Sequence, residues 1–317
     1  MSTPPSAPFG MSILQLKLAN CFAFCLTQFM SFLAARGTIS ELAVGEVSDM
    51  YPTKISPAGG AFSIWISIYL IEFMFLVYQF FWPKEDETRQ NKERAQNFLE
   101  ADDVAEQALA FKSTTGDEVI LKQIGLWFVS VCMFNAAWIC TFVQGTTFTT
   151  WVSTIIIAGL LFSLCKIYVN TGCWTTPRAP FGSPLQVVVQ AFLIDVHFTV
   201  YTSWVTVATI ANTAIAMTSV WSAEPATASA CSVGMLIVAF ALAIFIVLSR
   251  RDCAWGWVFS WASFWIYAAD YGDAVNVTAM TISVLSGLVS AAVGGRTAVK
   301  WYKGISEAGQ DGYSEGD

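Results

Sequence analysis

Three sets of aromatic and polar residues stand at helical spacing inside apolar stretches of the chain. The sets are Trp65, Tyr69 and Glu72; Asn135 and Trp138; and Trp204, Ala208 and Asn212. Because residues three or four positions apart share a helix face, each set should point in one direction. Indole and phenol rings offer flat surface with one donor, amides offer a donor and an acceptor, and a small alanine leaves room between them. The pattern indicates a site between helices for a flat, largely apolar ligand, although aromatic interface belts and asparagine bridges between helices have the same composition.

Three ionisable residues fall within or beside the same apolar stretches. Glu72 lies midway through its stretch, where a charged group is costly and usually functional. Asp195 and His197 lie early in a stretch that exceeds the thickness of the hydrocarbon core, so we expect both at the cytosolic interface. Glu72 is therefore the stronger candidate for a ligand pocket, with a structural hydrogen bond or a protonated packing residue as the alternatives.

The chain lacks the residue patterns of conventional catalytic centres. His197 is its single histidine, and its eight cysteines form no C-x-x-C pair. All cysteines except Cys173 lie in or beside apolar stretches, which favours packing over disulfides or metal binding. There is no phosphate-binding glycine loop and no nucleophile elbow. The sequence therefore predicts no catalytic residue, no metal site and no cofactor, and its net charge of −7 indicates no nucleic-acid partner.

The composition places these residues in a membrane protein. Of 317 residues, 55% are hydrophobic and 12% are charged, against about 25% charged in a typical soluble domain. Eight apolar stretches could each cross a hydrocarbon core, which takes about 20 helical residues. They lie at roughly 12–35, 60–82, 124–144, 148–168, 190–217, 229–249, 253–270 and 276–295. Because a backbone in the lipid bilayer must satisfy its own hydrogen bonds, we predict an all-α, polytopic transmembrane helix bundle of about eight spans.

Positive charge assigns the two sides of the membrane. With eight spans, both termini and the even-numbered connections share one side, and that side holds every Lys and Arg except Arg36 and Lys54. Cytosolic connections carry the excess of Lys and Arg in membrane proteins. We therefore expect a multi-pass protein with both termini on the cytosolic side. Of the segments outside the spans, the connection 83–122 should be a solvated helix, and the acidic tail 301–317 should be disordered.

Three blocks of the sequence resemble a known family. GEVSDMYPTKISPAGGAFSIWISIYL at 45–70, FNAAW at 134–138 and HFTVYTSWVTVATIAN at 197–212 are similar to the tryptophan-rich sensory protein family, which is related to the translocator protein and the peripheral benzodiazepine receptor. The chain looks closest to the longer branch of that family, which has additional C-terminal helices. The resemblance implies that residues 1–218, with the connection 83–122, form a translocator-like five-helix bundle and that residues 219–300 add three transmembrane helices.

The resemblance also assigns site residues. Trp65 and Tyr69 match a Trp-x-x-x-Tyr of the family's second helix, and the third and fifth helices supply the rest. Those matching residues are Asn135, Trp138, Tyr201, Trp204, Ala208 and Asn212. Together with Glu72 they imply a pocket between the first five helices for a tetrapyrrole, a sterol or a similar lipid. The family's proline before the fifth-helix tyrosine is missing ahead of Tyr201, which removes the usual cause of a helix distortion at the pocket mouth.

Two functions from different classes fit these features. The first is an integral membrane protein that binds, transports or senses a flat apolar ligand. The second is a structural or assembly subunit of a larger membrane complex, or of a homo-oligomer, without a ligand of its own. Porphyrin degradation would have only tryptophans as redox groups, so we expect no enzyme. Coupled transport has only Glu72 as a relay group and is disfavoured as well.

Overall fold

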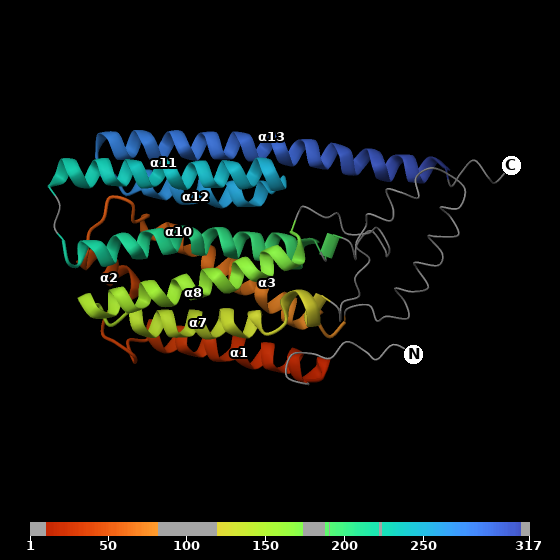
Figure 1. Ribbon diagram of the computed structural model, residues 1–317, viewed down its shortest axis with the longest axis horizontal. Helices are drawn as coiled ribbons and strands as arrows, with labels where there is room; N and C mark the ends of the chain where they lie inside the picture. The colour runs from red at the N-terminus through yellow and green to blue at the C-terminus, as the bar shows by residue number, and fades with distance from the viewer. Residues whose placement is uncertain (1–10, 82–118, 174–187, 190, 222–223, 312–317) are drawn as a thin grey trace.

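The computed structural model of the chain describes residues 11–81, 119–173, 188–189, 191–221 and 224–311. Within these ranges the regular secondary structure is entirely helical. The long helices run side by side in an elongated bundle, and the start of α1 and the end of α13 lie at the same end of it (Figure 1). A short helix, α2 (Val44–Met50), lies at the opposite end.

Eight long helical segments run along the bundle in the described ranges. They are α1 (Ile13–Ala35), η2 with α3 (Gly59–Ser63 and Ile64–Tyr78), α7 (Trp127–Phe142), α8 (Thr147–Thr171), η4 with α10 (Ala191–Val196 and His197–Thr218), α11 (Pro225–Arg250), α12 (Cys253–Ala268) and α13 (Asp273–Asp311). Six of the segments are long and apolar enough to cross a membrane, and α7 and α12 are shorter. Each expected stretch corresponds to one helix, which confirms the predicted all-α membrane bundle.

Local sequence sets several helix ends. The Ser12 hydroxyl accepts a hydrogen bond from the Gln15 amide, and the Gln15 side chain accepts one from the Ser12 amide, so α1 begins in a reciprocal cap. Gly172 ends α8 in the left-handed conformation that glycine adopts without strain. Asp252 caps α12 by accepting from the Trp255 amide at 3.2 Å. These caps satisfy backbone groups that the helices leave unpaired at their ends.

The helix α10 is the centre of the bundle. In its apolar window 72% of the residues are buried, whereas the corresponding share in the other candidate spans is between 22% and 39%. It packs against α8, α3 and α12, and Figure 1 shows it between α8 and the C-terminal helices α11–α13. The helix that carries Trp204 and Asn212 is therefore shielded on most sides, while the outer helices turn apolar side chains outward.

Small residues allow the helices α12 and α13 to pack tightly against each other. A Cβ atom added at Gly256 would collide with Ser290 Oγ, so the α12 backbone lies directly against the Ser290 side chain. One turn further along, Ser260 Oγ donates to the Ser283 carbonyl at 2.8 Å. Close backbone approach at small residues is a typical way for helices to associate in lipid.

A buried polar cluster joins α12 to the helices before it. The Asp252 carboxylate, in the turn after α11, accepts from Tyr168 Oη at 2.7 Å and from Thr199 Oγ1 at 2.8 Å. Its burial raises the pKa of Asp252 to about 6, while hydrogen bonds from Tyr168, Thr199 and the Trp255 amide act in the opposite direction. Buried apolar contacts continue from α1 to α12, so the proposed division after residue 218 is not a break in the core, and it stays a prediction.

Three local features differ from expectation. The π-helical turn Ala191–Val196 leads into α10, so a distortion is present without the family's proline. Val119 and Ile120 are buried, although the sequence placed them in the solvated connection 83–122, most of which lies outside the described residues. Residues 301–311 of the tail expected to be disordered continue α13, and 312–317 lie outside the described residues.

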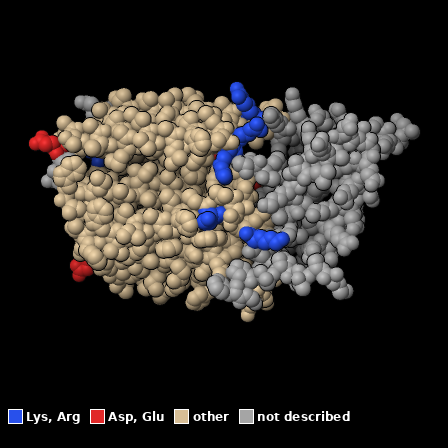
Figure 2. Space-filling model, viewed as in Figure 1, with Lys and Arg blue, Asp and Glu red and all other residues tan. Residues whose placement is uncertain are grey.

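The charged side chains divide between the two ends of the bundle. In Figure 2 most of the visible Lys and Arg side chains lie toward the end where α1 begins, and the visible Asp and Glu side chains lie mainly at the opposite end. This is the distribution on which the predicted orientation of the termini depends.

Candidate functional site

Trp65, in the first turn of α3, lies at the centre of a group of aromatic rings. Its ring stacks on Tyr69 and on Trp138 of α7, with centroid distances of 5.4 and 6.3 Å. Tyr201 and Trp204 of α10 meet it edge to face at 5.9 and 6.3 Å. We call these five residues the aromatic cluster. Three helices therefore bring together four rings that helical spacing had selected and Tyr201, which the family resemblance had added, in geometries that are favourable for aromatic pairs.

Asn135 connects the two tyrosines of the aromatic cluster. Its Nδ2 donates to Tyr201 Oη at 3.0 Å and to Tyr69 Oη at 3.3 Å. Because both phenol oxygens act as acceptors here, each hydroxyl hydrogen can still be donated to a further group. Asn135 is 1% exposed. The site can thus present two phenol donors to an acceptor on a ligand.

Asn212 forms a second polar connection, at the edge of the aromatic cluster. Its Oδ1 accepts from Trp138 Nε1 at 2.9 Å, and its Nδ2 donates to Thr154 Oγ1 at 2.7 Å and to Ser153 Oγ at 3.1 Å. The amide therefore joins α7, α8 and α10. These bonds fix the plane of the Trp138 indole, and with it the surface on which Trp65 stacks.

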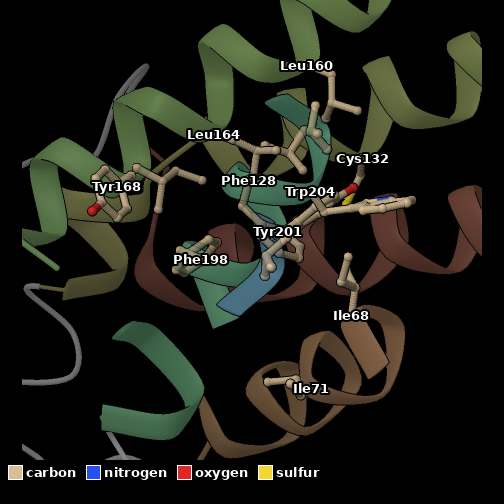
Figure 3. Packing of buried hydrophobic residues seen from close by; sticks show 14 of the residues in the cluster. Ile68, Ile71, Phe128, Cys132, Leu160, Leu164, Tyr168, Phe198, Tyr201 and Trp204 are labelled. Carbon is tan, nitrogen blue, oxygen red and sulfur yellow. The ribbon is translucent and has the colours of Figure 1, made fainter. Parts of the chain in front are cut away.

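Trp204 provides a hydrogen-bond donor that has no acceptor. The residue is 1% exposed, and its indole Nε1 has no hydrogen-bond partner in the described part of the chain. Figure 3 shows Trp204 and Tyr201 between Ile68 of α3 and Cys132 of α7. Since a buried unpaired N–H is costly, this group is the clearest place in the aromatic cluster for a ligand acceptor. Ala208, one turn further along α10, is partly buried against the same core.

Glu72 lies on the α3 face that carries Trp65 and Tyr69, and it is 2% exposed. Its carboxyl group is near enough to Tyr69, Tyr201 and Cys132 to interact electrostatically with all three. The predicted site residues are therefore neighbours in space. Whether they bind a ligand is a separate question, to which we return below.

Asp195 and His197, which the sequence placed at the cytosolic interface, are enclosed by protein. Both side chains are buried, and the His197 ring is fully enclosed against Phe75, Phe198 and Tyr201, at centroid distances of 6.0, 4.5 and 6.3 Å. The π-helical turn before His197 widens the helix there. These two groups are thus shielded from water by neighbouring helices, whereas Phe192 just before them is 40% exposed.

Sequence reasoning missed the neighbours that complete the site. Phe62, just before α3, lies edge to face on Trp204 at 6.1 Å. Thr150, Ser153 and Thr154 lie on one face of α8 and contact Asn212, the first through its carbonyl oxygen and the other two through their hydroxyls. Their spacing of three and four positions could have indicated in advance that they share one helix face. No group of three or more His, Cys, Asp or Glu residues suited to a metal ion occurs among the residues that the structure describes.

The fold and its long apolar helices define an integral, multi-pass membrane protein with an aromatic cluster between its helices. The family model described as TSPO-like protein matches residues 17–101 and 104–293, which is most of the chain. The chain therefore belongs to this family, as the resemblance of its three sequence blocks had indicated. Searches of curated proteins and of solved structures gave no match.

Proposed function

We propose that this membrane protein binds a flat, largely apolar ligand at the aromatic cluster, and that binding serves transport or sensing rather than catalysis. A tetrapyrrole, a sterol or a similar lipid has the required shape and polarity. The observation that carries the proposal is the buried, unpaired indole N–H of Trp204, whose ring meets the Trp65 ring edge to face. An acceptor on a ligand would satisfy this donor, which otherwise stays buried without a hydrogen bond.

The polar groups around the rings support an orienting role. Two phenol hydroxyls meet at Asn135, and the Glu72 carboxyl lies near them. A largely apolar ligand with a few polar substituents needs such a small number of placed groups within aromatic walls. We further propose that both termini lie on the cytosolic side, so that Trp65 lies in the non-cytosolic half of the bundle.

Binding of protoporphyrin IX to the purified protein in lipid nanodiscs tests the proposal. The porphyrin absorbance spectrum reports binding without depending on the tryptophans that are changed. We expect saturable binding at one site per chain, above the partitioning seen with empty nanodiscs. Combining Trp204→Ala with Asn135→Ala should weaken binding by about tenfold or more, because each lost aromatic or hydrogen-bonded contact contributes on the order of 1 kcal/mol.

The matched control is Trp257→Phe, on α12. Its side chain is 52% exposed on the outside of the bundle, so it should leave the affinity unchanged. An unaltered affinity in the Trp204 and Asn135 double variant would refute the assigned site. If no saturable binding occurs and a partner protein co-purifies in fixed proportion, the structural or assembly role is correct instead.

A further inference from the structure

The segment 51–63, which leads from α2 into α3, is attached to the C-terminal helices. We call it the strap. Tyr271 Oη, in the turn between α12 and α13, donates to the Ser56 carbonyl at 2.7 Å. The Ala58 amide donates to the Trp265 carbonyl of α12 at 3.0 Å. Two separate backbone groups of the strap thus depend on residues outside the first five helices.

Two further bonds extend the attachment along the strap. Lys54 Nζ donates to Ser229 Oγ of α11 at 2.6 Å, and Trp261 Nε1 donates to the Ala61 carbonyl at 3.3 Å. Ile55 is buried with apolar residues of α10–α13 and lines an apolar cavity between α10, α11 and α12. The strap is therefore fixed by both polar and apolar contacts.

Gly60 shows how closely the strap fits α12. A Cβ atom built there would lie 2.1 Å from the ring of Trp265, so any side chain would collide with the indole. At the neighbouring Gly59 nothing lies within 4 Å of such an atom. The requirement for glycine at position 60 arises from the Trp265 ring, because neither glycine has a positive φ.

The strap also adjoins the aromatic cluster. It contains Phe62, which contacts Trp204, and it ends directly before the turn of α3 that carries Trp65. At its other end Tyr51 Oη donates to the Gly145 carbonyl between α7 and α8 at 2.8 Å. The strap thus crosses the end of the bundle from the α7–α8 turn to the C-terminal helices. A ligand that approached the cluster from this end would have to pass it.

From these contacts we propose that Trp265 and Tyr271 hold the strap closed over the aromatic cluster, and that the C-terminal helices thereby set the rate at which ligand reaches the site. The inference depends on the proposed function, because a gate needs a ligand. It assigns the C-terminal helices a role that is separate from binding: Trp265 and Tyr271 are positioning residues and do not touch the ligand.

Such a gate has a kinetic signature. The strap is closed both before and after binding, so weakening its attachment raises the association and dissociation rates by the same factor and leaves Kd unchanged. A residue that only supported the shape of the site would change Kd instead. Tyr271→Phe removes one hydrogen bond and keeps the ring, and it should raise both rates about fivefold.

The test uses stopped-flow porphyrin binding and amide hydrogen exchange on the full chain in nanodiscs. Exchange of the Ala58 amide, which is bonded to Trp265, reports opening of the strap without any ligand. We expect this exchange to be about fivefold faster in Tyr271→Phe and faster still in Gly60→Ala. The controls are Tyr267→Phe, whose ring on α12 is 41% exposed, and Gly59→Ala. Both should behave as wild type.

The outcomes separate the two proposals. If wild-type protein binds no porphyrin, the proposed function fails, and with it the gate, whatever the exchange rates are. If porphyrin binds and Tyr271→Phe changes Kd, or leaves both rates unaltered, the binding site stands and the gate is refuted. Unchanged exchange at Ala58 in Tyr271→Phe also overturns the gate.

Discussion

The hydrogen bond from Trp138 to Asn212 gives the sharpest test of how the site is built. Trp138→Phe removes the indole donor and retains a ring for stacking. Asn212→Ala removes the acceptor and also the donor to Thr154 and Ser153. Because each single change leaves the other partner unpaired in a buried place, the two changes together should cost less than the sum of their separate effects.

The expected magnitudes follow from the bonds that each change removes. A hydrogen bond between membrane helices contributes about 0.6 kcal/mol on average and about 1.7 kcal/mol at most. At 2.9 Å the Trp138–Asn212 bond should give a coupling energy within that range. Asn212→Ala alone breaks the bonds to Trp138, Ser153 and Thr154 and the longer one to the Thr150 carbonyl, so it should lower the free energy of unfolding by about 2–3 kcal/mol.

The assay is reversible unfolding in mixed micelles with increasing sodium dodecyl sulfate, followed by circular dichroism. Circular dichroism is preferable to fluorescence because one variant lacks a tryptophan. The control cycle pairs Asn212→Ala with Trp257→Phe, which lies on α12 with its ring half exposed, and it should be additive. A coupling energy below about 0.3 kcal/mol for Trp138 and Asn212, the usual scatter of additive pairs, would refute the bond and the fixed plane of the indole.

Three other changes have definite expected results. Trp65→Ala should weaken porphyrin binding about tenfold, because it removes the ring that stacks on Tyr69 and Trp138. The helical circular dichroism should be retained, because the Trp65 side chain is only partly buried. Gly256→Ala should lower the free energy of unfolding by about 1–3 kcal/mol, since its Cβ would meet Ser290, whereas Gly234→Ala on α11, where nothing lies within 4 Å, should not. Asp252 has a folded pKa of about 6 against an ordinary 3.8, so its protonated form favours folding: the protein should gain stability, by up to about 3 kcal/mol, as pH falls through 6, and lose it as pH rises. Thermal unfolding at pH 5 and pH 7 would show about 1.3 kcal/mol of this difference in wild type and a smaller one in Asp252→Asn.

Much of the site could be predicted because it depends on periodicity within single helices. Trp65 and Tyr69 are four residues apart, and Asn135 and Trp138 are three residues apart. Each pair could therefore be assigned to one helix face without knowing the fold. In lipid the helices are the only regular option for such stretches, which made the spans predictable as well. That the faces meet was an expectation from the family resemblance, and the ring contacts of Trp65 agree with it.

Other parts could not be predicted, because they depend on pairs that are far apart in the sequence. Nothing near Ser56 indicates that its carbonyl accepts from Tyr271, more than 200 residues away. The enclosure of His197 could not be predicted either, for a physical reason. Hydropathy alone cannot distinguish a helix with an exposed start from one that neighbouring helices enclose over most of its length, as they do α10.

The closed packing of the aromatic cluster bears on which ligands can bind there. The proposed ligand would have to replace ring contacts of Trp65, and each aromatic pair contributes about 0.5–1.5 kcal/mol beyond its buried area. Burial of apolar surface returns about 25 cal/mol per Å². A small ring that buries on the order of 100 Å² therefore recovers only ~2.5 kcal/mol, about what it displaces, whereas a large flat molecule with several times that surface recovers much more. The packing of the rings thus disfavours small aromatic molecules and favours extended planar ligands whose polar substituents can reach the indole of Trp204 and the phenols at Asn135.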